Sequence, residues 1–421
     1  MQSEKMHELA VSLALIGALV LALGLASRPL ERLPVSGPLV ALLAGVALGP
    51  QGLEVLHPQR WGDEQRIVEE AARLTIAVGL MAIALRLPPG FLARHWRSLA
   101  ALLVLVMPLM ALVGGVLVWA LLGMPLLLAL VVGALLCPTD PIVATSIVTG
   151  SVAERSLPER LRDLLLGESG ANDGLAFPLV WLPLLLIALD PPQAWAHWLA
   201  RTLAWEVGGA IAAGALAGHL AGRLLMWAEA HHTIEVASFF AYTIALTLFS
   251  LGAAELAGMN GILAVFASGL AFSRAVGERD RVREERVQDA INGFFTLPIF
   301  VLIGLLVPWE GWRSLGLPGV ALAALILLLR RLPAVLLLSR LMPDLPARRD
   351  VLFAGWFGPI GVAALFYAML AARHVPDERL WPLASLVICA SVLVHGMTGA
   401  PFTLLYARRA RDGNGARLER L

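Results

Sequence analysis

Three carboxylates lie within the segments Pro138–Pro141 and Gly167–Gly174, in stretches that are otherwise apolar enough to form membrane helices. They are Asp140, Glu168 and Asp173. A charge inside a bilayer is costly, so such residues usually face a partner or a water-filled cavity and mark an ion or proton path. The pattern therefore predicts a cation path, and Asp173 is the first candidate for its binding residue.

Helical spacing sorts the polar side chains around Asp173 onto two faces. Glu168 and Asn172 are four residues apart and share one face of a helix. Ser169 and Asp173 share another face by the same spacing, and they supply oxygen atoms, which hard cations prefer. The face with Glu168 and Asn172 needs a positively charged partner instead. An arginine inside another span is the candidate. We expect a proton and a cation to compete for Asp173.

The composition places these residues in a polytopic membrane protein. Of the 421 residues, 58% are hydrophobic and 15% are charged, and the mean hydropathy is +0.78. In a soluble domain, about a quarter of the residues are charged. Cys137 and Cys389 both fall in apolar stretches, so we expect no disulfide framework and no cysteine metal site. We expect no cofactor and no nucleic acid partner.

Thirteen charge-poor runs are long enough to cross a bilayer, which takes roughly 17–25 residues. The first is interpreted as an uncleaved helix rather than a signal peptide because its apolar stretch is long enough to span. A short turn, Gly123-Met124-Pro125, separates the fourth run from the fifth. The predicted spans are 7–27, 35–51, 68–86, 98–122, 125–149, 161–189, 202–225, 233–254, 259–274, 289–308, 315–339, 351–372 and 380–406.

The distribution of arginines predicts the orientation of these spans. Loops that follow odd-numbered spans carry, together with the C-terminal tail, 22 arginines, whereas loops that follow even-numbered spans carry 6. Cytoplasmic loops are the ones enriched in Lys and Arg. We therefore expect the N-terminus outside and the C-terminus in the cytoplasm.

Two predicted spans are interrupted at corresponding positions. Pro138 and Pro141 bracket Thr139-Asp140 in the fifth span, and the segment Gly358-Pro359-Ile360-Gly361 lies in the twelfth. Two prolines so close together break the helical hydrogen-bond ladder. With spans 1–6 and 8–13 as two repeats and span 7 as linker, both interruptions fall on the fifth helix of a half. Such paired breaks indicate a transporter binding site between inverted repeats.

Crossed half-helices bring partial charges to the middle of the membrane, about +0.5 at each N-terminal end and −0.5 at each C-terminal end. Asp140 can offset the positive ends. The negative ends require a cation, and Arg330 and Arg331 lie in the middle of the eleventh span.

Several segments around these residues resemble the monovalent cation:proton antiporter-1 family, both its NhaP-like prokaryotic members and, more closely, the fungal plasma-membrane sodium/proton antiporters. The likeness extends over nearly the whole chain, and its two central motifs are highly specific. The segments that carry it are Thr139–Ala144, Leu161–Leu165, Glu168–Pro178, Arg331–Val335, Gly355–Val362 and His395-Gly396.

The resemblance implies roles for individual residues. Asp173 binds the cation or the proton, and Asp140, the Thr139 backbone carbonyl and Ser169 complete a site for a monovalent cation. Asn172 and Glu168 organise this site, with Glu168 paired to Arg331.

The resemblance also implies an assembly. The family fold is a homodimer in the lipid bilayer of the cell membrane, the inner membrane in bacteria. A core domain of residues 98–189 and 315–406 moves against a dimerisation domain of residues 7–86 and 233–308, and a linker helix covers 202–225.

One position differs from the pattern of close relatives. This chain has Arg86 before Leu87-Pro88, where close relatives carry an acidic residue. If that acid recruits cations, cation affinity or selectivity differs in this chain.

The function that follows from these expectations is secondary transport, not enzymatic catalysis. One sodium or lithium ion exchanges for one proton without net charge movement, by alternating access. Potassium/proton exchange is the alternative within this class. A channel and an intramembrane serine protease are the alternatives outside it. The protease would use Ser169 in Gly167-Glu168-Ser169-Gly170 as the nucleophile and His395 as its base, but it leaves the other intramembrane charges unexplained.

Other polar residues are expected to have ordinary structural roles. Arg330 is expected to be structural or to snorkel toward the interface, with a second site residue as the alternative. His395 is expected to pack between helices, with a pH sensor as the alternative. We expect Glu255 at the interface, with a place along the ion funnel as the alternative. The charged run 274–289 is expected to form a solvated loop helix, with a cytoplasmic regulatory segment as the alternative.

Overall fold

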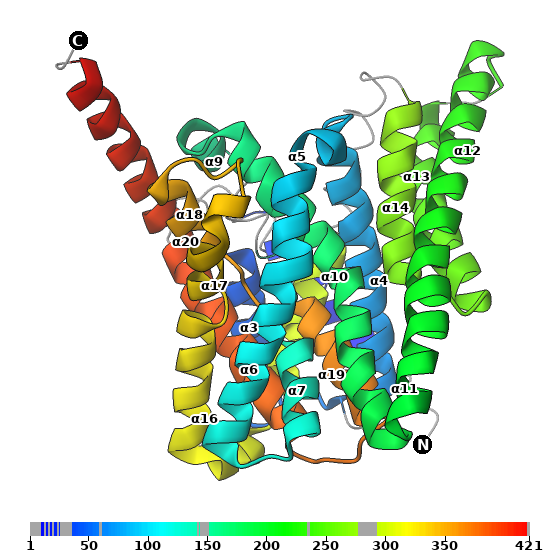
Figure 1. The fold of residues 1–421 in the computed structure, drawn as a ribbon. Coiled ribbons are helices and arrows are strands. Elements are labelled where there is room, and N and C mark those ends of the chain that lie inside the picture. The colour runs from blue at the N-terminus through cyan, green and yellow to red at the C-terminus, as the bar shows by residue number, and fades with distance from the viewer. Residues whose placement is uncertain are drawn as a thin grey trace.

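The computed structural model describes residues 36–58, 61–140, 143, 151–233, 236–276 and 293–418, together with isolated positions between 10 and 25. Throughout this part of the chain, every regular element is a helix (Figure 1). This confirms the predicted all-α polytopic membrane protein. Most of the expected first span, Pro141 and most of the expected loop helix at 274–289 lie outside the described residues.

Five helical stretches of the described chain are long and apolar enough to cross a bilayer, and shorter apolar helices accompany them. Figure 1 shows α16, α17, α18 and α20 at one side of the molecule, α12, α13 and α14 at the other, and α10 and α19 between them. The five long stretches are Phe91–Leu122, Glu159–Ala188, Pro191–Ala230, Trp309–Leu341 and Leu380–Arg408.

The helices α3 and α4 begin at side-chain caps. The Ser36 side chain caps α3 (Gly37–Leu48), and the Asp63 carboxylate accepts a 3.1 Å hydrogen bond from the Arg66 backbone N–H at the start of α4 (Glu64–Arg86). Such caps satisfy backbone donors that the helix itself leaves unpaired. α4 therefore begins four residues before the predicted span at 68.

The fourth span is one continuous helix made of α5 (Phe91–Ala100), a π-helical stretch (Ala101–Val106) and α6 (Met107–Leu122). Gly123 adopts the left-handed conformation (φ 61°) and turns the chain into α7 (Leu126–Leu135), as the short turn there predicted. α6 and α7 pack closely, because a Cβ on Gly133 would lie 2.1 Å from the Ala111 carbonyl oxygen.

A long helix, α10 (Glu159–Ala188), follows the short α9 (Ser151–Ser156) and carries most of the polar residues singled out above. The expected linker helix at 202–225 is longer than predicted. It runs without interruption through α11 (Pro191–His197), a π-helical stretch (Trp198–Gly209) and α12 (Ala210–Ala230). After it come α13 (Val236–Leu256), α14 (Gly261–Ala275) and a helix over Gly293–Leu305.

The eleventh predicted span is not a single helix. α16 (Trp309–Leu329) contains the left-handed Gly316 (φ 55°), and helix resumes after Arg330 and Arg331 as α17 (Leu332–Leu338). Pro333 explains the second interruption, because its ring clashes with the carbonyl four residues earlier and it lacks a backbone donor. The interruption places both arginines between two helical segments.

The last elements contain the second predicted interruption. After the 3₁₀ turn Ser339–Leu341, α18 (Arg348–Trp356) and α19 (Val362–Ala372) form the two halves of the twelfth span, and α20 (Leu380–Leu418) is the thirteenth. α7 likewise stops at Leu135, before the first proline pair. Both interrupted spans therefore break where the sequence predicted.

Candidate functional site

The two interruptions meet, and Asp140 joins them. Its backbone N–H donates a 2.7 Å hydrogen bond to the Pro359 carbonyl. Its carboxylate accepts from the backbone N–H of Val362, the first residue of α19, and from that of Val143 at 3.1 Å. Asp140 thus offsets the positive end of α19. A Cβ at Gly361 would lie 1.9 Å from the Asp140 carboxylate, so this contact requires glycine there.

Arg330 neutralises the opposite ends of the interrupted helices. Its guanidinium donates to the carbonyls of Leu136 and, at 3.5 Å, Pro138, and it donates to the Gly358 carbonyl at 2.6 Å. These carbonyls follow the C-terminal ends of α7 and α18, where helix dipoles are negative. The side chain is 2% exposed, so Arg330 does not snorkel. Its contacts with these carbonyls fit the expected structural role.

Arg331 pairs with Glu168 on α10. The two guanidinium Nη atoms donate to the two carboxylate oxygens at 2.7 Å each, and both side chains are 2% exposed. Arg331 Nε donates to the Ala354 carbonyl at 2.9 Å. Two parallel charge-assisted hydrogen bonds give a strong, directional contact. Gly358 leaves room for it, because a Cβ there would lie 2.2 Å from Arg331 Cδ.

Asn172 links this ion pair to the first interruption. Its Nδ2 donates to Thr139 Oγ1 at 2.6 Å and to Glu168 Oε1 at 3.2 Å, and its Oδ1 accepts from the Thr139 backbone N–H at 3.2 Å. Thr139 Oγ1 also shares a 2.9 Å hydrogen bond with Ser169 Oγ. The polar residues of α10 therefore hold the segment that follows α7 in a fixed position.

Asp173 differs from its polar neighbours. It is 1% exposed, and neither of its carboxylate oxygens has a hydrogen-bond partner within the described ranges. The charges that act on it most are two further carboxylates, Asp140 and Glu168. A buried carboxylate without a partner is unfavourable, so the geometry favours binding of a proton or a cation at Asp173.

Sequence reasoning missed two residues that hold α10 near Asp173. Tyr367 is fully buried in α19, and its hydroxyl donates to the Asp173 backbone carbonyl. Asn260 caps α14 by accepting from the Leu263 backbone N–H at 2.9 Å, and its Nδ2 donates to the Gly174 carbonyl at 3.5 Å. Two features of the sequence could have pointed to them. Tyr367 is one of only three tyrosines in the chain, and Asn260 stands directly before an apolar run, where a helix cap is expected.

His395 and Ser169 do not form a nucleophile–base pair. His395 Nε2 lies 3.1 Å from the Trp356 carbonyl, and Nδ1 lies 3.1 Å from Ser391 Oγ. Ser391 Oγ in turn accepts a 2.7 Å hydrogen bond from the Ile360 backbone N–H in the second interruption. His395 thus packs between helices and supports the crossing, as the structural interpretation expected. The protease alternative loses its base.

Charged residues in the first half of α4 form ion pairs with other segments. Glu255, at the end of α13, lies 3.2 Å from Arg73 of α4, and both side chains are partly exposed. Glu69 accepts a 2.7 Å hydrogen bond from Arg373, which follows α19. Glu255 therefore belongs to an ion pair between α13 and α4.

Known proteins match this chain over nearly its whole length. The family pattern of the transmembrane sodium/hydrogen exchangers matches residues 15–405. Na(+)/H(+) antiporter 2 of Zygosaccharomyces rouxii is 32% identical over 89% of this chain, which spans 50% of that relative. The K(+)/H(+) antiporter NhaP of Alkalimonas amylolytica is 25% identical over 94% of this chain and 67% of its own length.

A solved structure shares the fold. The sodium proton antiporter MjNhaP1 from Methanocaldococcus jannaschii, at pH 8, superposes with a TM-score of 0.72 over 94% of this chain and 99% of that chain. At 18% sequence identity, this likeness concerns the fold alone. The family pattern, which extends over residues 15–405, identifies this chain as a member of the sodium/hydrogen exchanger family.

Proposed function

We propose that the protein exchanges one sodium or lithium ion for one proton across the cell membrane, with both ions competing for Asp173. The observation that carries this proposal is the pair of buried Asp173 oxygens that lack partners in the described chain. A proton or a monovalent cation can each satisfy them, but not both at once. Alternate occupancy of one carboxylate is the simplest way to couple the two fluxes.

The surrounding residues support a site with a single exchangeable charge. Glu168 is engaged by Arg331, and Asp140 accepts backbone hydrogen bonds from Val362 and Val143. Asp173 alone among these three carboxylates has no such partner in the described ranges. Ser169, one turn earlier on α10, and the Thr139 carbonyl are the proposed neutral oxygen ligands.

The exchange is proposed to be electroneutral. The residue before Asp173 is Asn172, an amide that cannot carry a second proton. The cationic residue opposite is Arg331, and arginine keeps its proton at any workable pH. One negative charge at the site therefore accommodates either one proton or one monovalent cation.

The proposed transport cycle moves a core domain, residues 98–189 and 315–406, against a dimerisation domain, residues 7–86 and 233–308, in a homodimer. The glycines of α10 support a sliding contact between them. A Cβ at Gly170 would lie 2.6 Å from the Phe266 ring, and one at Gly174 would lie 2.8 Å from Leu263 Cβ, both on α14. A smooth face on α10 thus lies directly beside Asp173.

The arginine distribution supports an N-terminus outside and a C-terminus in the cytoplasm. In Figure 1 the arginine-rich ends of α5, α9, α18 and α20 lie on one side of the molecule, which is the proposed cytoplasmic side.

Proteoliposomes test the function. A luminal pH indicator should report proton flux when sodium or lithium is added outside, and the rate should not change under an imposed membrane potential. A flux driven by potassium but not by sodium would support potassium/proton exchange instead. Acceleration by the potential, or a potential generated by exchange, would contradict one-for-one exchange. Cation current without coupled proton movement would indicate a channel.

A further inference from the structure

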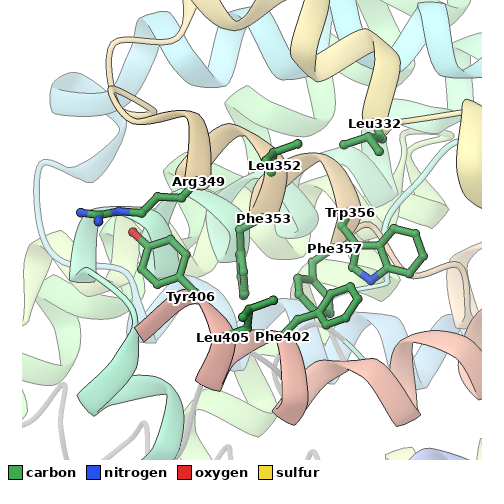
Figure 2. Close-up of a pocket in the computed structure, with 9 residues that line it drawn as sticks. All are labelled: Leu332, Arg349, Leu352, Phe353, Trp356, Phe357, Phe402, Leu405 and Tyr406. Atoms are coloured by element: carbon green, nitrogen blue, oxygen red, sulfur yellow. The ribbon is translucent and has the colours of Figure 1, made fainter. Parts of the chain in front are cut away.

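An apolar groove lies between α18 and α20, separate from the ion-binding residues. Its volume is about 240 Å³, enough for a stretch of hydrocarbon chain rather than a single water. Its walls are aromatic and aliphatic side chains (Figure 2), chiefly Phe353 and Trp356 of α18, Phe357 directly after it, and Phe402 and Leu405 of α20.

The groove opens at the periphery of the molecule. Phe402 is 39% exposed and Leu405 is 44% exposed, although both line it. α20 and α18 lie at one edge of the helices in Figure 1. The indole N–H of Trp356 donates to Thr398 Oγ1 at 3.2 Å, so it is not available to a ligand. An occupant would therefore enter from the bilayer and meet almost only apolar atoms along the wall.

One end of the groove is positively charged. Figure 2 shows Arg349 and Tyr406 together at the end opposite Trp356 and Phe357, and the Arg349 guanidinium lies 5.6 Å from the centre of the Tyr406 ring. Arg408, two residues beyond Tyr406, is also exposed. The groove thus has an apolar body and a cationic end.

One buried carboxylate at this end is shared by two arginines. Asp350 is fully buried, and it accepts hydrogen bonds from the Tyr406 hydroxyl at 2.5 Å and from Arg160 at 2.8 Å. Arg349 Nε also lies 3.9 Å from an Asp350 oxygen, so this one carboxylate faces two arginines and the group keeps a net positive charge. Arg348 and Arg408 are exposed and adjoin the lining residues in sequence.

We propose that this groove binds one anionic glycerophospholipid, with part of an acyl chain between α18 and α20 and its phosphate beside Arg349. Charge complementarity and the apolar wall favour this occupant, because basic pockets at the cytoplasmic ends of membrane helices bind anionic headgroups. The binding site itself requires no assumption about transport, although the leaflet follows from the proposed orientation.

The groove is connected to the crossing of the interrupted helices. Trp356 and Phe357 line it and directly precede Gly358, whose carbonyl accepts from Arg330. The Trp356 carbonyl also contacts His395. A bound acyl chain supports the last turn of α18 from the lipid side, so the lipid stabilises the half-helix that leads into the site.

Native mass spectrometry of the full-length protein tests the proposal, with phosphatidylglycerol and phosphatidylcholine of identical acyl chains as probes. The wild-type protein should retain one phosphatidylglycerol under conditions that remove phosphatidylcholine, and this lipid should raise the melting temperature. Arg349→Gln should weaken phosphatidylglycerol binding by about fivefold, as expected for loss of one lipid-facing arginine. Its binding of phosphatidylcholine should not change.

A matched pair of variants locates the lipid. Leu405→Trp should fill the groove and abolish retention, whereas Leu404→Trp, at a neighbouring exposed position that does not line it, should retain the lipid. Equal retention of both lipids by the wild-type protein would show ordinary annular lipid and overturn the proposal. Equal behaviour of the two tryptophan variants would also overturn it. Melting temperatures without lipid show whether each variant is folded, and transport activity plays no part in the outcome.

Discussion

Glu168 and Asp173 lie five residues apart on α10 and have opposite surroundings. Both are buried, with 2% and 1% exposure. Both Glu168 oxygens accept hydrogen bonds from Arg331 at 2.7 Å, whereas neither Asp173 oxygen has a partner in the described part of the chain. The same chemical group thus serves two purposes. One carboxylate holds the crossed helices together, and the other is left available for an exchangeable ion.

The energetics of the two positions differ accordingly. Removing one member of a buried ion pair leaves an uncompensated charge and costs roughly 3–5 kcal/mol. An unpartnered carboxylate already lacks such compensation, so converting it to an amide removes the cost of burying an unpaired charge. Stability should therefore depend on Glu168, and transport on Asp173.

The largest expected effect is loss of transport in Asp173→Asn. The amide keeps the shape of the side chain but cannot exchange a proton for a cation, so cation-dependent proton flux should fall to the level of empty liposomes. The melting temperature should stay at or above that of the wild-type protein. Proteoliposome flux and a thermal melt measure the two quantities on one preparation.

Glu168→Gln is the matched control for this substitution. It makes the same chemical change five residues away, but it leaves Arg331 without its charged partner, so the melting temperature should drop. If Asp173→Asn instead unfolded the protein while Glu168→Gln left it stable, the roles of the two carboxylates would have to be exchanged.

The next effect concerns the ion pair itself. Arg331→Ala and Glu168→Ala should each destabilise the protein by roughly 3–5 kcal/mol, and the double variant should lose much less than the sum. Denaturation of the purified protein measures this coupling. Arg330→Ala with Glu168→Ala is the control cycle, because Arg330 binds carbonyls of the interruptions. Additive losses in the Arg331 cycle would contradict the pairing.

The smallest effect is expected at Ser169. Ser169→Ala removes one neutral oxygen beside Asp173 and its hydrogen bond to Thr139, but it leaves every carboxylate in place. The half-saturating sodium concentration should rise by roughly tenfold or less, as for one modest polar interaction, while exchange survives. A complete loss of exchange, or an unchanged sodium dependence, would argue against Ser169 as a neutral ligand.

Local signals in the sequence predicted the parts of the site that depend on one or two segments. Proline and glycine clusters marked both interruptions because their effect on a helix is local. The carboxylates of α10 could be identified as functional candidates because a charge in an apolar span is energetically costly. The Glu168–Arg331 contact was implied by family resemblance, since residues 163 positions apart share no local signal.

Other features arise only when distant segments meet. Arg330 was expected to be structural or to snorkel. Its role depends on backbone carbonyls of two other spans, which lie beside it only in the folded protein. Tyr367 was overlooked for the same reason, because its partner is a backbone carbonyl of α10. The break before α17 was predictable in principle from Pro333, but continuous hydropathy concealed it.

Proton release on sodium binding tests the central claim most directly. Sodium added to purified protein in weakly buffered solution, with a pH indicator, should release up to one proton per chain, and Asp173→Asn should release none. Release should diminish as the starting pH rises, because the cation then meets a site that has already lost its proton. Undiminished release from folded Asp173→Asn, or sodium binding to the wild-type protein without proton release at any pH, would contradict competition at Asp173.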